Sequence, residues 1–197
     1  VRERTARADF ESSVNAAKRA IEDGDAFQIV VSQRLDVSTS ASGIDVYRVL
    51  RTVNPSPYMY FLDLPDELGG HFEVVGSSPE TLVKTERRRV WTYPIAGSRP
   101  RGADSAEDHR LAAELLEDPK ELSEHVMLVD LARNDLSKVC DPASVEVSTL
   151  MDLKRFSHIQ HISSTVTGVL RPDADALDAL VATFPAGTLS GAPKPRA

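Results

Sequence analysis

Two glutamates at helical spacing are the residues of this chain that most directly suggest metal chemistry. In the segment KELSEHVMLVDLARNDLSKVC, Glu121, Glu124 and Leu128 would lie within about 60° of one another on one helical face. Like charges three positions apart repel each other, and a hard divalent cation would compensate because it prefers carboxylate oxygens. Taken alone, the spacing favours a simpler interpretation: both acids face solvent at the start of the helix, where its dipole stabilises them.

A second candidate is the segment PAGTLSGAPK, whose small residues would let the backbone approach a ligand closely. The segment offers hydroxyls, accessible N–H groups and one positive charge, which suits a carboxylate or a phosphate. The phosphate-binding pattern G-x-x-x-x-G-K-[ST] is absent. As an isolated signal a plain turn is the simpler interpretation. The residues concerned are Thr188 and Ser190, Gly187 and Gly191, and Lys194.

The segment PIAGSRPRG could also bind an anion. Gly97 and Ser98 supply a backbone and a hydroxyl, and Arg99 and Arg101 are close in sequence. A surface loop is an equally good interpretation of its proline and glycine content.

A histidine in RFSHIQHISSTVTG is the best candidate for acid–base chemistry near neutral pH. If this segment is a strand, His158 and Gln160 face one way, and Ile159 and His161 the other. A histidine in a strand is more often a hydrogen-bonded structural residue. The motifs HExxH, paired CxxC and GxSxG are missing, so zinc and serine hydrolases have no support.

The elements that must position these residues indicate an α+β fold with antiparallel strands, since strands occur in runs with helices between the groups. Helical periodicity predicts helices at 9–23, 44–53, 105–117, 119–137 and 175–184. Strand-like runs cover 26–37, 58–64, 72–77, 81–86, 88–93, 144–150 and 155–170. Residues 93–105 and 185–197 are predicted to be loops.

Composition narrows the class of protein. The 197 residues carry a net charge of -7 and no basic stripe, which argues against nucleic acid as a partner. No apolar run approaches the ~20 residues of a membrane span, and the N-terminus lacks a signal-like apolar core. The single cysteine, Cys140, fits a reducing cytoplasm, and we expect it to be a small buried residue rather than a catalytic thiol.

Individually weak, the four segments are specific in their order. PIAGSRPRG, ELSEHVMLVDLARND, FSHIQHISSTVTG and GTLSGAPK follow one another as in the chorismate-utilising enzymes, which the chain resembles from about residue 9 to its end. The resemblance implies a layered fold of antiparallel sheets and outer helices, chorismate as substrate and Mg²⁺ as cofactor.

The resemblance also implies roles for particular residues. Glu124 matches a direct Mg²⁺ ligand, and Glu121 one that supports the ion through water. Gly97 and Ser98 match a loop that touches chorismate. The remaining matches are the substrate-contacting Thr188 and the Gly191 that closes the same motif, the His161 linked to pyruvate elimination, and Gln28.

Two positions favour the anthranilate-forming branch of this family. Gln28 stands where the water-adding branch carries a lysine, and a neutral side chain there leaves the site open for ammonia. Ala96 stands where a related branch carries a nucleophilic lysine, and alanine cannot form a covalent intermediate. The implied reaction is a carbon–oxygen lyase step: ammonia, supplied by a glutamine amidotransferase partner, converts chorismate to anthranilate and pyruvate in tryptophan biosynthesis.

The segment NPSPYMYF resembles the part of these enzymes that binds tryptophan as a feedback inhibitor, with Pro57, Tyr58 and Met59 as the matching residues. The resemblance further implies that residues 1–197 are a partial catalytic domain, without the family's N-terminal regulatory region and C-terminal closing section. We therefore expect the chain alone to be nearly inactive.

Two alternatives stay open. Gln160 stands where methionine is frequent in the family, which leaves the branch of the family open. One alternative is an aminodeoxyisochorismate synthase, which aminates chorismate without eliminating pyruvate. A non-catalytic fragment that docks the amidotransferase is the other.

Overall fold

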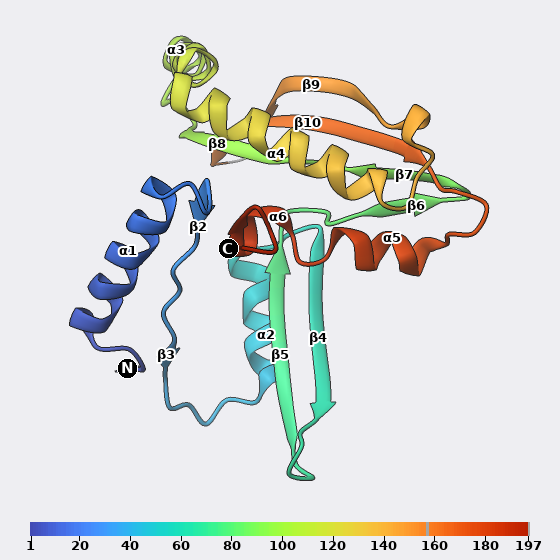
Figure 1. Ribbon diagram of the computed structural model, residues 1–197. Coiled ribbons are helices and arrows are strands. Elements are labelled where there is room, and N and C mark those ends of the chain that lie inside the picture. The colour runs from blue at the N-terminus through green and yellow to red at the C-terminus, as the bar shows by residue number, and fades with distance from the viewer. Residues whose placement is uncertain (157, 197) are drawn as a thin grey trace. The chain divides into compact units, whose positions relative to one another are not determined.

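The computed structural model describes residues 1–156 and 158–196 (Figure 1). Its internal contacts divide the chain into two compact units. The first comprises Val1–Asp9 and Gln33–Thr81, and the second Phe10–Ser32 and Leu82–Ala197.

The first unit is built on a hairpin covered by a helix. Strands β4 (Tyr58–Pro65) and β5 (His71–Ser78) pair antiparallel. Helix α2 (Gly43–Val53) packs on them, and the rings of Tyr47 and Phe61 meet edge-on with centroids 6.5 Å apart. Ser42 caps the helix, since its side chain accepts the N–H of Asp45. Short strands β1 (Arg2–Glu3) and β3 (Leu35–Asp36) form a separate pair.

The second unit holds a five-stranded antiparallel sheet, helices and short connecting elements. The sheet strands are β6 (Lys84–Glu86), β7 (Arg89–Thr92), β8 (Ile95–Pro100), β9 (Glu146–Arg155) and β10 (Ile159–Val169). The helices are α3 (Ser105–Glu117), α4 (Pro119–Ser137), α5 (Ala176–Thr183) and α6 (Gly187–Ser190), with a 3-10 turn at Pro142–Ser144. Two-residue strands β2 (Gln28–Ile29) and β11 (Gly191–Ala192) pair with each other. Helix α1 spans Arg7–Glu22, and its residues from Phe10 onward belong to this unit.

Strand β10 is the centre of this sheet. One of its edges pairs with β9. Its other edge pairs first with β8, opposite Ile159–Ser163, and then with β7, opposite Val166–Val169. At the break between these two strands, the backbone N–H of Ser164 donates to the carbonyl of Pro94 at 3.0 Å. The chain from β7 to β8 thus follows β10 along nearly its whole length.

Helix α4 packs on β8 and β10 (Figure 1). Asp118 begins it, because the Asp118 carboxylate accepts the N–H groups of Lys120 and Glu121, and Pro119 occupies the first turn. Its apolar side closes a core in which Val90, Leu136 and Val166 have no exposed surface. Five more buried residues complete this core: Val129, Val139, Cys140, Leu170 and Ala179.

Most predicted elements are confirmed. The chain is α+β with antiparallel sheets, and the five predicted helices occur within two residues of their expected bounds. The strand predicted at 26–37 is wrong for most of its length, because only the residues of β2 and β3 pair with another strand. The loop predicted at 93–105 contains β8, and the loop predicted from 185 contains α6 and β11. In both segments pairing with a distant strand overrides the local proline and glycine content.

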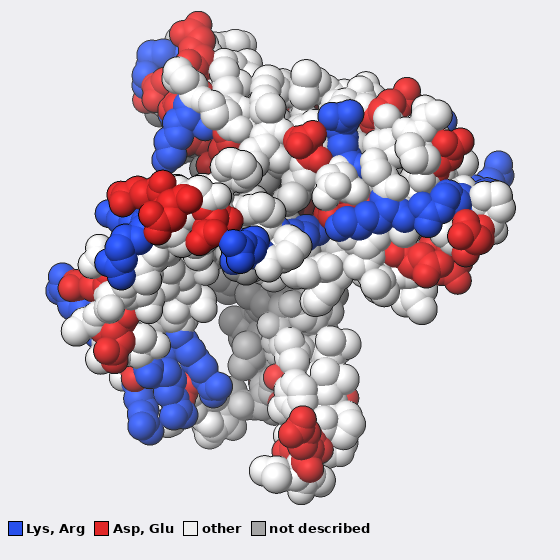
Figure 2. Space-filling model, in the orientation of Figure 1, with Lys and Arg blue, Asp and Glu red and all other residues white. Residues whose placement is uncertain are grey.

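Two smaller expectations also have an outcome. Cys140 has no exposed surface, and burial raises the pKa of its thiol, as expected for a packed residue. No helix among the described residues is long and apolar enough to cross a membrane. Acidic and basic side chains both occur on the face shown in Figure 2.

Candidate functional site

The glycine of PIAGS forms a bulge in β8. Ser98 lies opposite His161 and Ala96 lies opposite Ile162, so Gly97 is an extra residue in the strand. Its φ of 68° is in the left-handed region that favours glycine. This conformation accompanies a contact with β10: the Gly97 carbonyl is 2.9 Å from Nδ1 of His161.

That contact defines which ring nitrogen of a neutral His161 carries the hydrogen. A carbonyl oxygen only accepts, so Nδ1 must carry the proton that it donates. In the neutral ring Nε2 is then the basic nitrogen, available to take a proton. The ring of Phe156 packs edge-on against the imidazole, with 5.8 Å between centroids, and helps to fix its orientation. His161 is therefore positioned for acid–base chemistry at Nε2.

Glu121 lies against the same bulge. A Cβ added to Gly97 would be 3.1 Å from Oε2 of Glu121 and 3.0 Å from Cδ1 of Leu115. A side chain at this position would require Glu121 and Leu115 to shift by a few tenths of an ångström. The structure therefore brings Gly97, Glu121 and His161 together, with the exposed Ser98 beside them.

The two arginines of PIAGSRPRG are engaged in ion pairs. Arg99 donates to Asp118 at 2.9 Å and to Glu114 at 3.1 Å, and its guanidinium lies 3.8 Å from Glu121. The N–H of Glu121 and then the hydrogen bond from Arg99 hold the pKa of Asp118 below its usual value. These contacts join β8 to the junction of α3 and α4, so Arg99 acts on the site through Glu121.

Arg101 forms the second of these pairs. It donates two hydrogen bonds to Asp108, at 2.7 and 3.0 Å. Arg101 and then the Gly102 N–H lower the pKa of Asp108 to about 2. An anion would have to compete with a carboxylate for either arginine, so the structure does not support them as free anion ligands.

Glu124 follows Glu121 by about one helical turn. It is half-buried, and it has no hydrogen bond or ion pair with any residue that the structure describes. No group of three His, Cys, Asp or Glu side chains with metal-binding geometry occurs within residues 1–156 and 158–196. Glu121 and Glu124 could therefore supply only part of a metal's ligands.

The GTLSG segment forms α6 and the start of β11. Gly187 abuts α4 so closely that a Cβ would overlap Cδ2 of Leu131, at 1.9 Å. Gly191 has a φ of 140°, a conformation that favours glycine. Thr188 belongs to α6, but its side chain is outside the part of the molecule that the structure describes.

Gln28 is brought to this segment by strand pairing. It lies opposite Ala192 in the β2–β11 pair. Its side-chain oxygen is buried and has no hydrogen-bond partner within the described ranges. A buried acceptor without a partner is costly, and a ligand N–H group could satisfy it.

The three residues predicted to bind an inhibitor lie in the first unit. Tyr58 begins β4, its ring is half-exposed, and its hydroxyl shares a hydrogen bond with that of Thr81. Met59 is the second residue of the strand, and Pro57 is the residue before the strand begins.

Sequence reasoning missed a buried pair that fixes α4 on the sheet. His125 and Ser164 have at most 1% exposed surface, and Nε2 of His125 lies 2.6 Å from Oγ of Ser164. Burial lowers the pKa of His125, which favours the neutral ring. One signal in the sequence could have identified His125: its i, i+4 spacing from Glu121 places both residues on one helical face.

Comparison with known proteins agrees with this arrangement. The profile of the family described as chorismate binding enzyme matches residues 1–197. Anthranilate synthase component 1 of Arthrobacter globiformis is 56% identical over 197 residues, which are 100% of this chain and 37% of that protein. The Mycolicibacterium smegmatis protein of the same name is 58% identical over 178 residues, or 90% of this chain and 34% of its own length.

A solved structure gives the same result. Anthranilate synthase component I from Streptococcus pneumoniae superposes with a TM-score of 0.85 and 42% identity, covering 99% of this chain and 42% of that one. The chain thus spans about a third of the curated relatives it matches, at 37% and 34% of their lengths. With a family profile matching throughout and relatives above half identity, the chain belongs to the chorismate binding enzymes.

Proposed function

We propose that this chain is part of the large subunit of an anthranilate synthase, a carbon–oxygen lyase that converts chorismate and ammonia to anthranilate and pyruvate in tryptophan biosynthesis. The names of the relatives support this proposal. The observation that carries it is the contact of Gly97 with both Glu121 and His161, because it joins three of the four motifs in one place.

In the proposed reaction His161 moves a proton. Its Nδ1–H is committed to the Gly97 carbonyl, so Nε2 is the atom that takes or returns a proton while pyruvate leaves and the ring becomes aromatic. Ala96 is buried next to the bulge and has no nucleophilic group. Ammonia therefore attacks the substrate ring directly, and the ring hydroxyl leaves as water.

We propose Mg²⁺ as the cofactor, held by Glu124 directly and by Glu121 through water. Half-burial of Glu124 without a described partner fits this role. Mg²⁺ often takes only one or two protein carboxylates and keeps several waters, so two glutamates at this spacing could form part of its coordination shell. When bound, the ion would offset their charges and attract a carboxylate of the substrate.

The remaining roles follow from the same assignment. Ser98, Thr188 and Gly191 would contact chorismate, and the neutral Gln28 would accept a hydrogen bond from a ligand N–H group. A glutamine amidotransferase would supply the ammonia, and Pro57, Tyr58 and Met59 would contribute to a tryptophan site. A cytoplasmic location agrees with the single buried thiol of Cys140.

Equilibrium binding tests the proposal on the 197-residue chain. Calorimetric titration should show saturable binding of chorismate that tightens with Mg²⁺. Glu124→Gln keeps the shape of the side chain and removes its charge, and should weaken binding about 10-fold in the presence of Mg²⁺. Glu117→Gln, an exposed glutamate at the end of α3, is the matched control and should bind as wild type. A folded chain without saturable chorismate binding would contradict the proposal.

Product analysis separates the alternatives. With chorismate, ammonium and Mg²⁺, any turnover should give fluorescent anthranilate, although we expect little from this chain alone. An aminated product that keeps its pyruvyl group would identify an aminodeoxyisochorismate synthase instead. Binding of an amidotransferase without binding of chorismate would identify a docking fragment.

A further inference from the structure

Lys194, the last charged residue of GTLSGAPK, is buried in an ion pair. Its side chain is 11% exposed, and Nζ contacts the carboxylate of Asp135, which is 7% exposed. Nζ also donates to the Thr183 carbonyl at 2.8 Å. Asp135 receives a second hydrogen bond at 2.9 Å from Lys138, which is half-exposed. The charge of Lys194 is therefore balanced inside the protein.

The pair lies at the point where the C-terminal segment meets α4. Gly187, which rests on Leu131, is also near Lys194: a Cβ on Gly187 would lie 3.6 Å from Cε of Lys194. The segment is thus held against α4 at both of its ends. Asp135 is on the same helix as Glu124, so one rigid element carries the anchor and the candidate metal ligand.

Strand pairing extends this anchor to Gln28. The N–H of Phe27 donates to the Ala192 carbonyl, and the N–H of Val30 donates to the Ser190 carbonyl, both at 2.8 Å. The β2 backbone is therefore hydrogen-bonded to residues that immediately precede Lys194. The ion pair of Lys194 is thus connected through the backbone to both strands of this small sheet.

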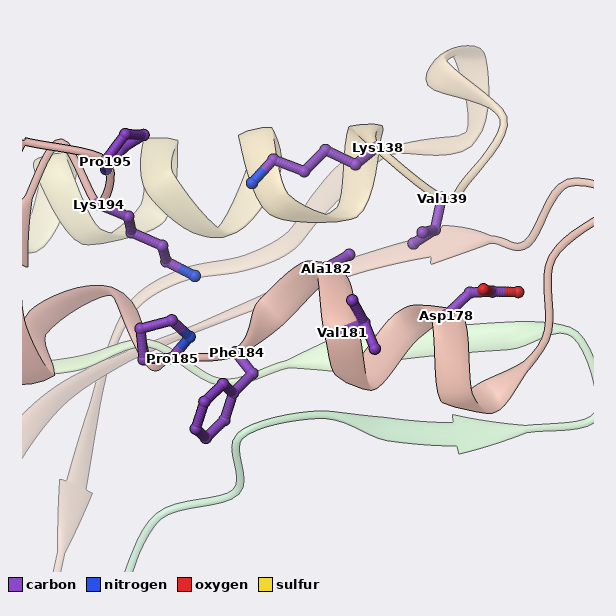
Figure 3. A pocket seen from close by; sticks show the side chains of 9 residues that line it. All are labelled: Lys138, Val139, Asp178, Val181, Ala182, Phe184, Pro185, Lys194 and Pro195. Atoms are coloured by element: carbon purple, nitrogen blue, oxygen red, sulfur yellow. The ribbon is translucent and has the colours of Figure 1, made fainter.

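Lys194 could instead be an anion ligand, but its surroundings argue against that role. Lys138 and Lys194 line a pocket of about 500 Å³ with apolar neighbours, among them Val181, Phe184 and Pro185 (Figure 3). Two hydrogen bonds already hold the Lys194 ammonium, to Asp135 and to Thr183. Only one N–H of the ammonium is left for an anion, and an anion there would lie next to the negative carboxylate of Asp135.

We infer that Asp135 and Lys194 are positioning residues: their ion pair holds residues 187–192, and through β11 also Gln28, at a fixed place relative to Glu124. The inference rests on the proposed function in one respect, since it takes this segment as part of the chorismate site. Neither residue contacts the substrate. Both act by placing groups that do.

Hydrogen exchange measured by mass spectrometry tests the anchor without reference to activity. Lys194→Met and Asp135→Asn should speed exchange selectively in peptides that cover 27–30 and 186–192. Leu136→Ala, which opens a cavity in the core next to Asp135, is the control for general destabilisation and should not show this selectivity. Equal acceleration in all three variants, or none in the first two, would overturn the inference.

Ligand binding tests the consequence. Lys194→Met should raise the Kd for chorismate about 10-fold, and Lys194→Arg, which keeps the charge, should restore most of the affinity. A variant with a loosened segment and wild-type affinity would overturn the positioning role. If the wild-type chain binds no chorismate, the proposed function fails, and the exchange experiment still decides whether the pair anchors the segment.

Discussion

At the scale of single residues, the candidate site depends on a glycine that has no functional group. Gly97 lets β8 bulge, offers its carbonyl to His161 and leaves space for Glu121. The two properties of glycine involved are separable: its freedom to adopt a positive φ, and its lack of a side chain. Replacing Gly97 by alanine, and comparing it with the same replacement at another glycine of positive φ, distinguishes these two properties.

Gly97→Ala should lower stability and weaken chorismate binding. A positive φ costs a residue with a Cβ about 1–2 kcal/mol, and here the methyl group would also press on Glu121 and Leu115. Gly24→Ala is the matched control, because Gly24 has a φ of 80° with no atom within 4 Å of an added Cβ. Urea denaturation should show a larger loss for Gly97→Ala, and titration with chorismate a loss of affinity for that variant alone. Equal effects at both positions would show that Glu121 simply moves aside.

At the scale of elements, periodicity predicted the helices well and the β8 segment poorly. Apolar residues repeat along α2, α3, α4 and α5, and capping residues define their starts. The segment Ile95–Pro100 has a glycine and a proline and little strand propensity, so its pairing with β10 had no local signal. Conversely, residues 26–37 are rich in β-branched side chains but pair only at β2 and β3.

The candidate site was predictable to a similar degree. The order of the four motifs predicted Glu121, Gly97 and His161 as site residues, and in the structure Glu121 and His161 both lie next to Gly97. The partners of Arg99 and Lys194 could not be predicted, because each ion pair depends on an element distant in sequence or on a helix junction. The same holds for His125, whose partner Ser164 is 39 residues away.

The junction between β8 and α3 should make stability depend on pH at the acid end. Asp108 has a pKa of about 2 in the folded chain against a usual value of 3.8. Its ionised form therefore stabilises the fold above the unfolded value, and this contribution is lost as the pH falls from 3.8 towards 2. Asp108→Asn should lower the melting temperature at neutral pH and flatten its fall across that interval. Asp130→Asn, an exposed carboxylate on α4, should leave the melting curve unchanged at every pH.

At the scale of the whole molecule, the chain leaves large apolar side chains in solvent. Leu177, Val181 and Phe184 of the α5 region are 65%, 68% and 67% exposed, whereas Ala179 on the same helix is fully buried. The apolar surface of α5 is therefore divided between a packed side and an open side. No element among the described residues covers this surface of α5. The chain spans 37% of the length of one relative.

The open side of α5 should tolerate charge and the packed side should not. Val181→Lys should change the free energy of unfolding by no more than about 0.5 kcal/mol, because a surface substitution removes little packing. It should also reduce the binding of an apolar dye such as anilinonaphthalene sulfonate, since less apolar surface remains exposed. Ala179→Lys would bury an unpaired charge and should cost more than about 4 kcal/mol. Urea denaturation and dye fluorescence measure the two effects. If Val181→Lys destabilised the chain as much as Ala179→Lys, the exposed side of α5 would be packed in solution, and the division of the helix into two sides would be wrong.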